Sequence, residues 1–171
     1  NRGVEAMKLK DIDIAFFDLD GVLSVPRYET GLGIKCALPD EDWFQEVNWC
    51  SDVYRHCEPV PQVIKLLEQL KKRNTRLYVL THETNSGAYF NKVDFVLEHY
   101  KDYFPSYREV LFVNKSEKKA DLMSVLCSRY GISRKHCLLV EDTYNTCIQV
   151  CNDGFQVLHI SELLLNGGEF N

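Results

Sequence analysis

The sequence lacks the features that mark membrane-spanning proteins, nucleic-acid-binding proteins and repeat proteins. No apolar run approaches the about 20 residues needed to cross a bilayer, which excludes a membrane-spanning role. The net charge of -5 provides no basic excess to meet a phosphate backbone, so we expect no nucleic-acid partner. Internal repeats, low-complexity tracts and long linkers are also missing. With 45% hydrophobic residues in 171, the chain is expected to form a single domain over residues 7–171.

The cysteines lack the pairing that zinc sites and secreted proteins show. The chain has seven, an odd number, with no CxxC motif and no secretory leader before them. Cys147 and Cys151 lie four residues apart on a predicted helix, but the second clustered pair usual in zinc sites is missing. We therefore expect reduced thiols in a cytoplasmic protein.

Apolar periodicity predicts alternating strands and helices. Short continuous apolar runs indicate buried strands, and spacings of i, i+3, i+4 and i+7 indicate amphipathic helices. The predicted strands cover residues 12–17, 76–80, 110–113, 137–140 and 156–160. The predicted helical stripes cover residues 63–70, 89–100 and 123–130. This alternation predicts a doubly wound α/β domain, in which helices cover both faces of a parallel sheet.

Residues 24–58 do not follow this alternation. The segment has no clean period, is acidic overall and carries Trp43, Phe44 and Trp49. Aromatic residues at such spacing usually pack an insertion onto a core, although they also suit a substrate pocket. We interpret the segment as a small cap or loop insertion after the first strand.

Polar side chains gather at the ends of the predicted strands. In open sheets of this kind, ligands bind beyond the carboxyl ends of the strands, where the order of winding reverses. The candidate residues, which come from four separate segments, are Asp18, Asp20, Thr81, Lys119, Glu141 and Asp142. His82 directly follows Thr81 and is a candidate for substrate contact from the same rim. We expect these side chains to converge on one site.

Each of these residue types suits phosphoryl transfer. The Asp18 carboxylate can attack phosphorus, and Asp20 can donate a proton to the leaving oxygen and later take one from water. Clustered acids repel an anionic substrate, so a hard divalent ion such as Mg²⁺ is needed, held by Asp18 and Asp142. The Thr81 hydroxyl and the Lys119 ammonium are then candidates to bind the phosphoryl oxygens.

The ordered set of motifs resembles the haloacid dehalogenase-like (HAD) phosphohydrolases. The match comprises DLDGV at 18–22, LT at 80–81, a lysine at Lys119 and VED at 140–142. The resemblance implies a Rossmann-like core with strand order 5-4-1-2-3. It also implies a reaction through an aspartyl-phosphate intermediate.

The resemblance further implies the role of each site residue. Asp18 is the nucleophile and Asp20 the acid/base, while Thr81 and Lys119 hold the phosphate. Mg²⁺ is coordinated by Asp18, the backbone carbonyl of Asp20, and Asp142.

Two features depart from the family pattern. Many relatives have a further aspartate after the fourth motif, where this chain has Asn145 and Thr146, so Glu141 or Asn145 is left as a supporting ligand. The insertion at 24–58 is also small beside the caps of many relatives. Lys118 is an alternative phosphate lysine, although the family spacing favours Lys119.

These residues predict a Mg²⁺-dependent phosphomonoester hydrolase that acts on a small phosphorylated metabolite. A phosphomutase is the neighbouring alternative, but it must exclude water under a larger cap. A receiver-like or phosphate-binding module without turnover is the other, although the acids after the first strand of a receiver are adjacent rather than alternating. The identity of the substrate is left open. A homo-oligomer is also compatible with the small cap, because a partner subunit can cover the site.

Overall fold

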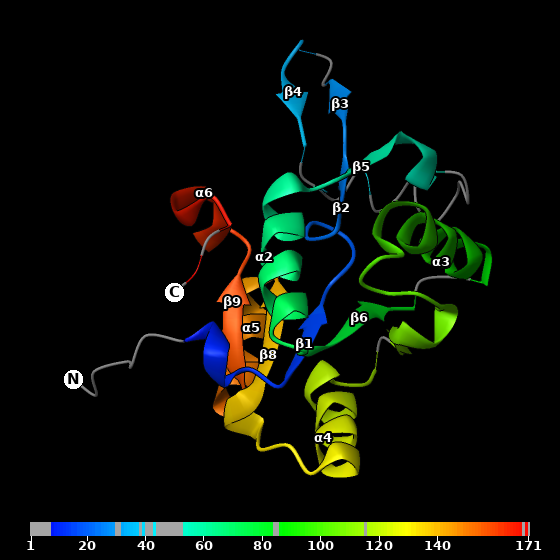
Figure 1. Cartoon of the computed structure of the whole chain (residues 1–171). Coiled ribbons are helices and arrows are strands. Elements are labelled where there is room, and N and C mark those ends of the chain that lie inside the picture. Colours follow the sequence, from blue (N-terminus) through cyan, green and yellow to red (C-terminus); the bar gives the residue numbers. More distant parts are fainter. Residues whose placement is uncertain are drawn as a thin grey trace.

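The sheet that carries the site has five strands, all parallel (Figure 1). The structure is a computed structural model, and it describes residues 8–29, 32–37, 39, 43, 53–83, 86–114, 116–168 and 170. The strand order β7-β6-β1-β8-β9 confirms the expected order 5-4-1-2-3, read from the opposite edge. The strands are β1 (Ile14–Phe17), β6 (Arg76–His82), β7 (Val110–Val113), β8 (Cys137–Glu141) and β9 (Gln156–His159).

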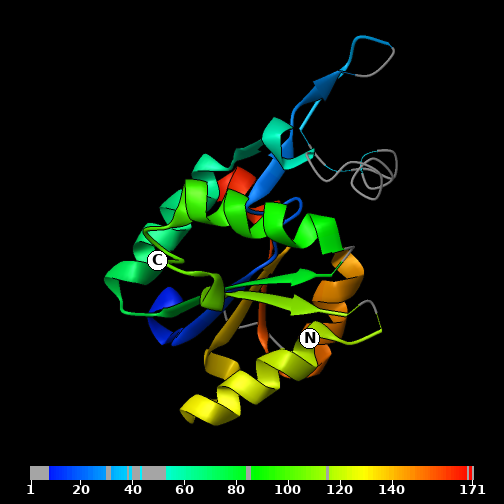
Figure 2. The same ribbon diagram turned by 90° about the vertical axis from the view of Figure 1, so that its right-hand side faces the viewer.

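Helices cover both faces of this sheet, as predicted for a doubly wound domain (Figure 2). They are α2 (Pro61–Lys72), α3 (Ser86–Tyr100), α4 (Lys119–Tyr130), α5 (Tyr144–Asn152) and the short α6 (Glu162–Asn166). Successive side chains of a strand point to opposite faces. Phe17 therefore packs with α2 and α3, and Phe16 packs with α4 and α5. Burying a side chain of this size stabilises the fold by about 1.5–3 kcal/mol.

The ends of α2 and α4 follow from their sequences. α2 begins with Pro61, whose fixed φ and missing N–H suit the first helical position. Lys71 and Lys72 lie in its last turn, where positive charge complements the helix dipole. α4 ends at Gly131, which has a φ of 66° and donates its N–H to the carbonyl of Cys127. Both helices contain the predicted apolar stripes.

β6 and β8 extend further than the apolar runs predicted. We expected the second strand to end at Leu80, with His82 in the following loop, and this boundary is wrong. Thr81 and His82 belong to β6 because they pair with the last two residues of β7. Glu141 is likewise the last residue of β8, paired with β9. An apolar run does not show how far a neighbouring strand continues the ladder.

The segment 24–58 leaves and rejoins the core through an antiparallel pair of strands, β2 and β5. Its described elements are β2 (Ser24–Pro26), β3 (Tyr28–Glu29), β4 (Lys35–Cys36), the 3-10 turn η2 (Val53–His56) and β5 (Cys57–Pro59). Trp43 is buried and packs edge-on against Tyr54, with 6.1 Å between ring centroids. Trp43 also belongs to the buried cluster that contains Phe17 and residues of α2 and α3, so it packs the insertion onto the core. Phe44 and Trp49 lie outside the described residues.

Three further 3-10 turns complete the elements in the described part of the chain: η1 (Leu9–Asp11), η3 (Tyr107–Glu109) and η4 (Arg134–His136). No helix in this part is both long and apolar enough to span a membrane. The cysteines described as free thiols are Cys57, Cys127, Cys137, Cys147 and Cys151.

Replacing Tyr100 with phenylalanine is expected to lower the free energy of unfolding by about 1–3 kcal/mol. The fully buried Tyr100 hydroxyl donates to the carbonyl of Leu23 at 2.6 Å and accepts the N–H of Val60 at 2.9 Å. It thereby ties together the two ends of the insertion, and its loss leaves both backbone groups unpaired. Urea unfolding measures the effect. Tyr107→Phe, at a side chain that is 59% exposed, is the control; equal losses in the two variants would contradict this account.

Candidate active site

Asp18 lies where the order of winding reverses, between β1 and β8. Its backbone N–H donates to the carbonyl of Val140 at 3.0 Å, so the ladder between these strands continues to the aspartate. Its Oδ1 accepts the N–H of Leu19 at 2.8 Å. The residue is only 9% exposed. The strand therefore delivers an almost buried carboxylate to the position where doubly wound sheets bind ligands.

Gly21 lets a second acid approach the turn after β1. Its φ of 81° lies in the left-handed region, which glycine adopts without strain. A Cβ atom at this position would lie 2.2 Å from Oδ2 of Asp142. The glycine of the DLDGV motif is therefore needed for the turn and for the space that Asp142 occupies.

Lys119 joins the nucleophile candidate to β8. Its ammonium lies 2.9 Å from Oδ1 of Asp18 and 2.6 Å from Oε2 of Glu141. The lysine is 3% exposed and Glu141 is 1% exposed, so this is a buried ion-pair network. Burial opposes the charge on Lys119, but the two carboxylates outweigh burial and raise the pKa of the lysine.

Glu141 also orders the turn that presents Asp142. Its Oε1 accepts the backbone N–H of Asp142 at 3.0 Å and that of Thr143 at 3.1 Å. Because its other oxygen accepts from Lys119, both oxygens are engaged by protein donors. Glu141 therefore holds neighbouring groups in place.

Asp20 and Thr81 are joined by a residue that the sequence analysis did not identify, Lys92 of α3. The Lys92 ammonium lies 3.2 Å from Oδ2 of Asp20 and donates to the Thr81 hydroxyl at 3.0 Å and to the carbonyl of His82 at 2.9 Å. The other oxygen of Asp20 accepts the hydroxyl of Tyr54 at 2.6 Å. Thr81 and Lys92 are both 1% exposed.

A signal for Lys92 was present in the sequence. It lies within the apolar stripe of α3, three residues after Tyr89 and four before Val96. A lysine on the buried side of a helix needs an acidic partner, because an unpaired charge is costly to bury. The stripe therefore indicated a buried ion pair, although not the identity of its partner.

His82, the last residue of β6, has a half-buried ring near both lysines of the site. The charges of Lys119, Asp18 and Lys92 all act on its half-buried ring. Burial, reinforced by the two lysines, lowers its pKa, which favours the neutral imidazole. Its Nδ1 is buried without a hydrogen-bond partner among the residues that the structure describes.

Asp18, Glu141 and Asp142 form an acidic group that is compact enough to hold a metal ion. Their ligand oxygens all lie within 4.8 Å of one another. The group is the only candidate of its kind in the described ranges, and it contains no cysteine, so it gives no support to zinc at Cys147 and Cys151. The Asp20 carboxylate does not belong to it, and the predicted role of the Asp20 backbone carbonyl as a ligand stays a prediction.

The acidic charge of the site exceeds the basic charge. Four carboxylates stand against two ammonium groups, which leaves two negative charges when all are ionised; these residues are Asp18, Asp20, Glu141, Asp142, Lys92 and Lys119. Burial, only partly offset by Lys119, raises the pKa of Asp18 from 3.8 to about 7. Burial also raises the pKa of Asp142 to about 6. One divalent cation would balance the excess.

The sequence left two choices open: Lys118 or Lys119 as the phosphate lysine, and Glu141 or Asn145 as the supporting residue. The members of each pair lie in different surroundings. Lys118 is exposed at the N-cap of α4, whereas Lys119 is buried in the site. Asn145 is exposed in the first turn of α5, and no contact in the described structure joins it to the acidic group. The structure therefore brings together Lys119 and Glu141 with Asp18, not Lys118 or Asn145.

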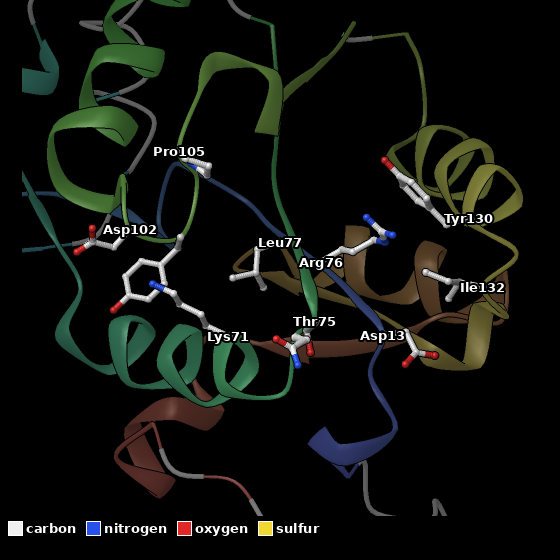
Figure 3. A pocket seen from close by; sticks show the side chains of 11 residues that line it. Asp13, Lys71, Thr75, Arg76, Leu77, Asp102, Pro105, Tyr130 and Ile132 are labelled. Carbon is white, nitrogen blue, oxygen red and sulfur yellow. The ribbon is translucent and has the colours of Figure 1, made fainter.

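A cavity of about 680 Å³ lies at the amino ends of β1 and β6, at the other end of these strands from the site (Figure 3). It is lined by Asp13 before β1 and by Arg76 and Leu77 of β6, with Asp102 and Tyr130 on either side. None of the site residues described above lines it. We place the chemistry at the carboxyl edge, where the buried acids and lysines lie.

The fold is a Rossmann-like α/β core, and a group of carboxylates lies at the carboxyl ends of its strands. The family model for haloacid dehalogenase-like hydrolases matches residues 27–149, and the chain belongs to this family. The matched residues include Thr81, Lys119 and Asp142, whereas Asp18 and Asp20 precede them. No curated protein matches the sequence.

Solved structures share the fold at low sequence identity. A HAD hydrolase of family IA, variant 3, from Entamoeba histolytica is 16% identical with a TM-score of 0.56, over 90% of this chain and 89% of that one. A haloacid dehalogenase-like hydrolase from Bacteroides fragilis is 15% identical with a TM-score of 0.56, over 85% and 86%. A HAD family hydrolase from Deinococcus radiodurans, with bound phosphate and sodium, is 12% identical with a TM-score of 0.55, over 88% and 81%.

Replacing Asp142 with asparagine is expected to stabilise the metal-free protein at alkaline pH. Because the pKa of Asp142 is about 6 in the fold and 3.8 ordinarily, the folded state binds this proton more tightly than the unfolded state. The resulting stability is lost as the pH rises through about 6. We expect the variant to exceed the parent by about 1–2 kcal/mol above pH 7 and the difference to shrink toward pH 5.

Urea unfolding in the presence of a chelator measures this difference. Asp102→Asn, at an exposed aspartate away from the site, is the matched control and should show no such gain. A gain in Asp142→Asn that did not change with pH would contradict the explanation.

Proposed function

We propose that the chain is a Mg²⁺-dependent phosphomonoester hydrolase that acts on a small phosphorylated metabolite through an aspartyl-phosphate intermediate. The observation that carries the proposal is the buried Asp18 carboxylate, held by Lys119 at the switch point of the sheet beside Glu141 and Asp142. Membership of a hydrolase family supports hydrolysis as the reaction class. A positioned carboxylate supports the covalent route.

The donor set fits a hard divalent ion. Carboxylate oxygens are the ligands that Mg²⁺ prefers, and the site carries more negative than positive charge. Asp18 and Asp142 would hold the ion with the backbone carbonyl of Asp20, while Glu141 would keep Lys119 and the turn at Asp142 in place. When bound, Mg²⁺ would neutralise the acids and orient the phosphoryl group.

In the first half-reaction, Asp18 attacks the phosphorus of the substrate. Its Oδ1 accepts from Leu19 and Lys119, so Oδ2 is the attacking oxygen. As the bond from Oδ2 to phosphorus forms, the bond from phosphorus to the leaving oxygen breaks. The leaving oxygen takes the proton of the Asp20 carboxyl group and departs as an alcohol.

In the second half-reaction, water attacks the phosphorus of the aspartyl phosphate. Asp20, now ionised, takes a proton from that water. The bond between phosphorus and Oδ2 of Asp18 breaks, inorganic phosphate is released, and both aspartates return to their starting states.

Lys119, Thr81 and His82 would bind the substrate. An ammonium has three N–H donors, and Lys119 directs two of them at Asp18 and Glu141, which leaves one for a phosphoryl oxygen. The Thr81 hydroxyl accepts from Lys92, so its own O–H is available to donate. His82, whose half-buried ring is within reach of the charges of Lys119 and Asp18, would contact the substrate from the same rim.

Phosphate release tests the proposal. With Mg²⁺ present, we expect turnover on at least one member of a broad panel of phosphomonoesters, and a loss of about 10³-fold or more in kcat for Asp18→Asn. Asp13→Asn, at the other end of the same strand, is the matched control and should retain activity. The absence of release across the panel, or an undiminished rate in Asp18→Asn, would refute the proposal.

The affinity for Mg²⁺ is expected to rise with pH. The ligands must be deprotonated to bind a metal, and burial raises the pKa of Asp18 to about 7 and that of Asp142 to about 6. Below these values, affinity should increase by about 10-fold per pH unit for each proton displaced, and it should level off above them. Calorimetric titrations between pH 5.5 and 8.5 measure this dependence, and a flat profile would contradict it.

A further inference from the structure

The Asp20 carboxylate is held from two sides. Tyr54 donates its hydroxyl to Oδ1 at 2.6 Å, and the Lys92 ammonium lies 3.2 Å from Oδ2. A single contact would leave the carboxylate free to rotate about its side-chain bonds. Contacts on both oxygens fix its position and its plane.

Lys92 and Tyr54 differ in the other groups to which they donate hydrogen bonds. The three N–H donors of Lys92 match three acceptors, which are Asp20, Thr81 and the carbonyl of His82, so none is left over for a substrate. Tyr54 has a single hydroxyl, and it is directed at Asp20. Tyr54 therefore offers a way to disturb Asp20 without disturbing Thr81.

Tyr54 comes from the insertion and is itself held firmly. It lies in η2 and is 5% exposed. Its ring packs edge-on against Trp43, with centroids 6.1 Å apart, and against Phe95 of α3 at 6.2 Å. Burial and the nearby Asp20 carboxylate raise its pKa well above its usual value, so the phenol keeps the proton that it donates.

We propose that Tyr54 is a positioning residue for the reaction, which fixes the Asp20 carboxyl group for proton transfer to the leaving oxygen. Through it, the packing of the small insertion at 24–58 determines how well the acid/base residue is placed. The inference rests on the proposed phosphatase function, and it adds a role for a residue outside the recognised motifs.

If Tyr54 positions Asp20, the rate loss caused by Tyr54→Phe should depend on the leaving group of the substrate. A nitrophenolate departs readily without a proton, whereas phenolate is a stronger base and depends more on general-acid assistance. A poorly placed Asp20 therefore slows phenyl phosphate hydrolysis more than 4-nitrophenyl phosphate hydrolysis. The loss of an unrelated structural contact would slow both reactions alike.

The test compares kcat/KM of Tyr54→Phe for these two substrates, because kcat/KM reports on the step in which the leaving group departs. We expect a loss of about 10–100-fold with phenyl phosphate and a loss at least several-fold smaller with 4-nitrophenyl phosphate. Tyr78→Phe is the matched control, because it removes a half-buried hydroxyl whose partner is Tyr130 and which lies outside both the insertion and the site. It should leave the ratio of the two kcat/KM values unchanged.

A double-mutant cycle with Asp20→Asn completes the experiment. If Tyr54 acts through Asp20, adding Tyr54→Phe to Asp20→Asn should cost no further activity with phenyl phosphate. Two outcomes would overturn the positioning role while the parent remained an active phosphatase. One is an equal loss of kcat/KM on both substrates. The other is a loss from Tyr54→Phe that is as large in the Asp20→Asn background as in the parent. A parent without turnover on either substrate or the wider panel would instead overturn the proposed function, and the positioning role with it.

Discussion

The site depends on one buried network, in which the Lys119 ammonium lies between the carboxylates of Asp18 and Glu141. Each charge would be costly to bury alone, because desolvation of an unpaired ion costs several kcal/mol. The three residues come from the start of α4, the end of β1 and the end of β8. The network therefore joins elements from separate parts of the chain and also holds the proposed nucleophile at the switch point.

The pairing within the site is incomplete. Two lysines face four carboxylates, and burial raises the pKa values of Asp18 and Asp142 because neither is fully compensated. Such an excess of buried negative charge is typical of a functional site, and it supports the proposed binding of a divalent cation. The second lysine, Lys92, orders Asp20 and Thr81, and Tyr54 brings the insertion into direct contact with the same aspartate.

Much of the fold could be predicted because its signals are local. The apolar run before Asp18, the stripe of α2 and the stop at Gly131 each reflect interactions within a few residues of the chain. The ends of β6 and β8 could not be predicted in this way. Thr81, His82 and Glu141 extend these strands because neighbouring strands pair with them, and an apolar run does not show that pairing.

The sequence by itself determined the alternation of strands and helices, the family pattern and the residues Asp18, Asp20, Thr81, Lys119 and Asp142 as candidates. These follow from periodicity and from the order of short motifs, which do not depend on contacts between distant segments. Only the tertiary structure decided that Glu141 and Lys119, rather than Asn145 and Lys118, adjoin Asp18, and that Lys92 and Tyr54 hold Asp20. The physical reason is that ion pairs and buried hydrogen bonds act over a few ångströms between residues remote in the chain, so folding must first bring them together.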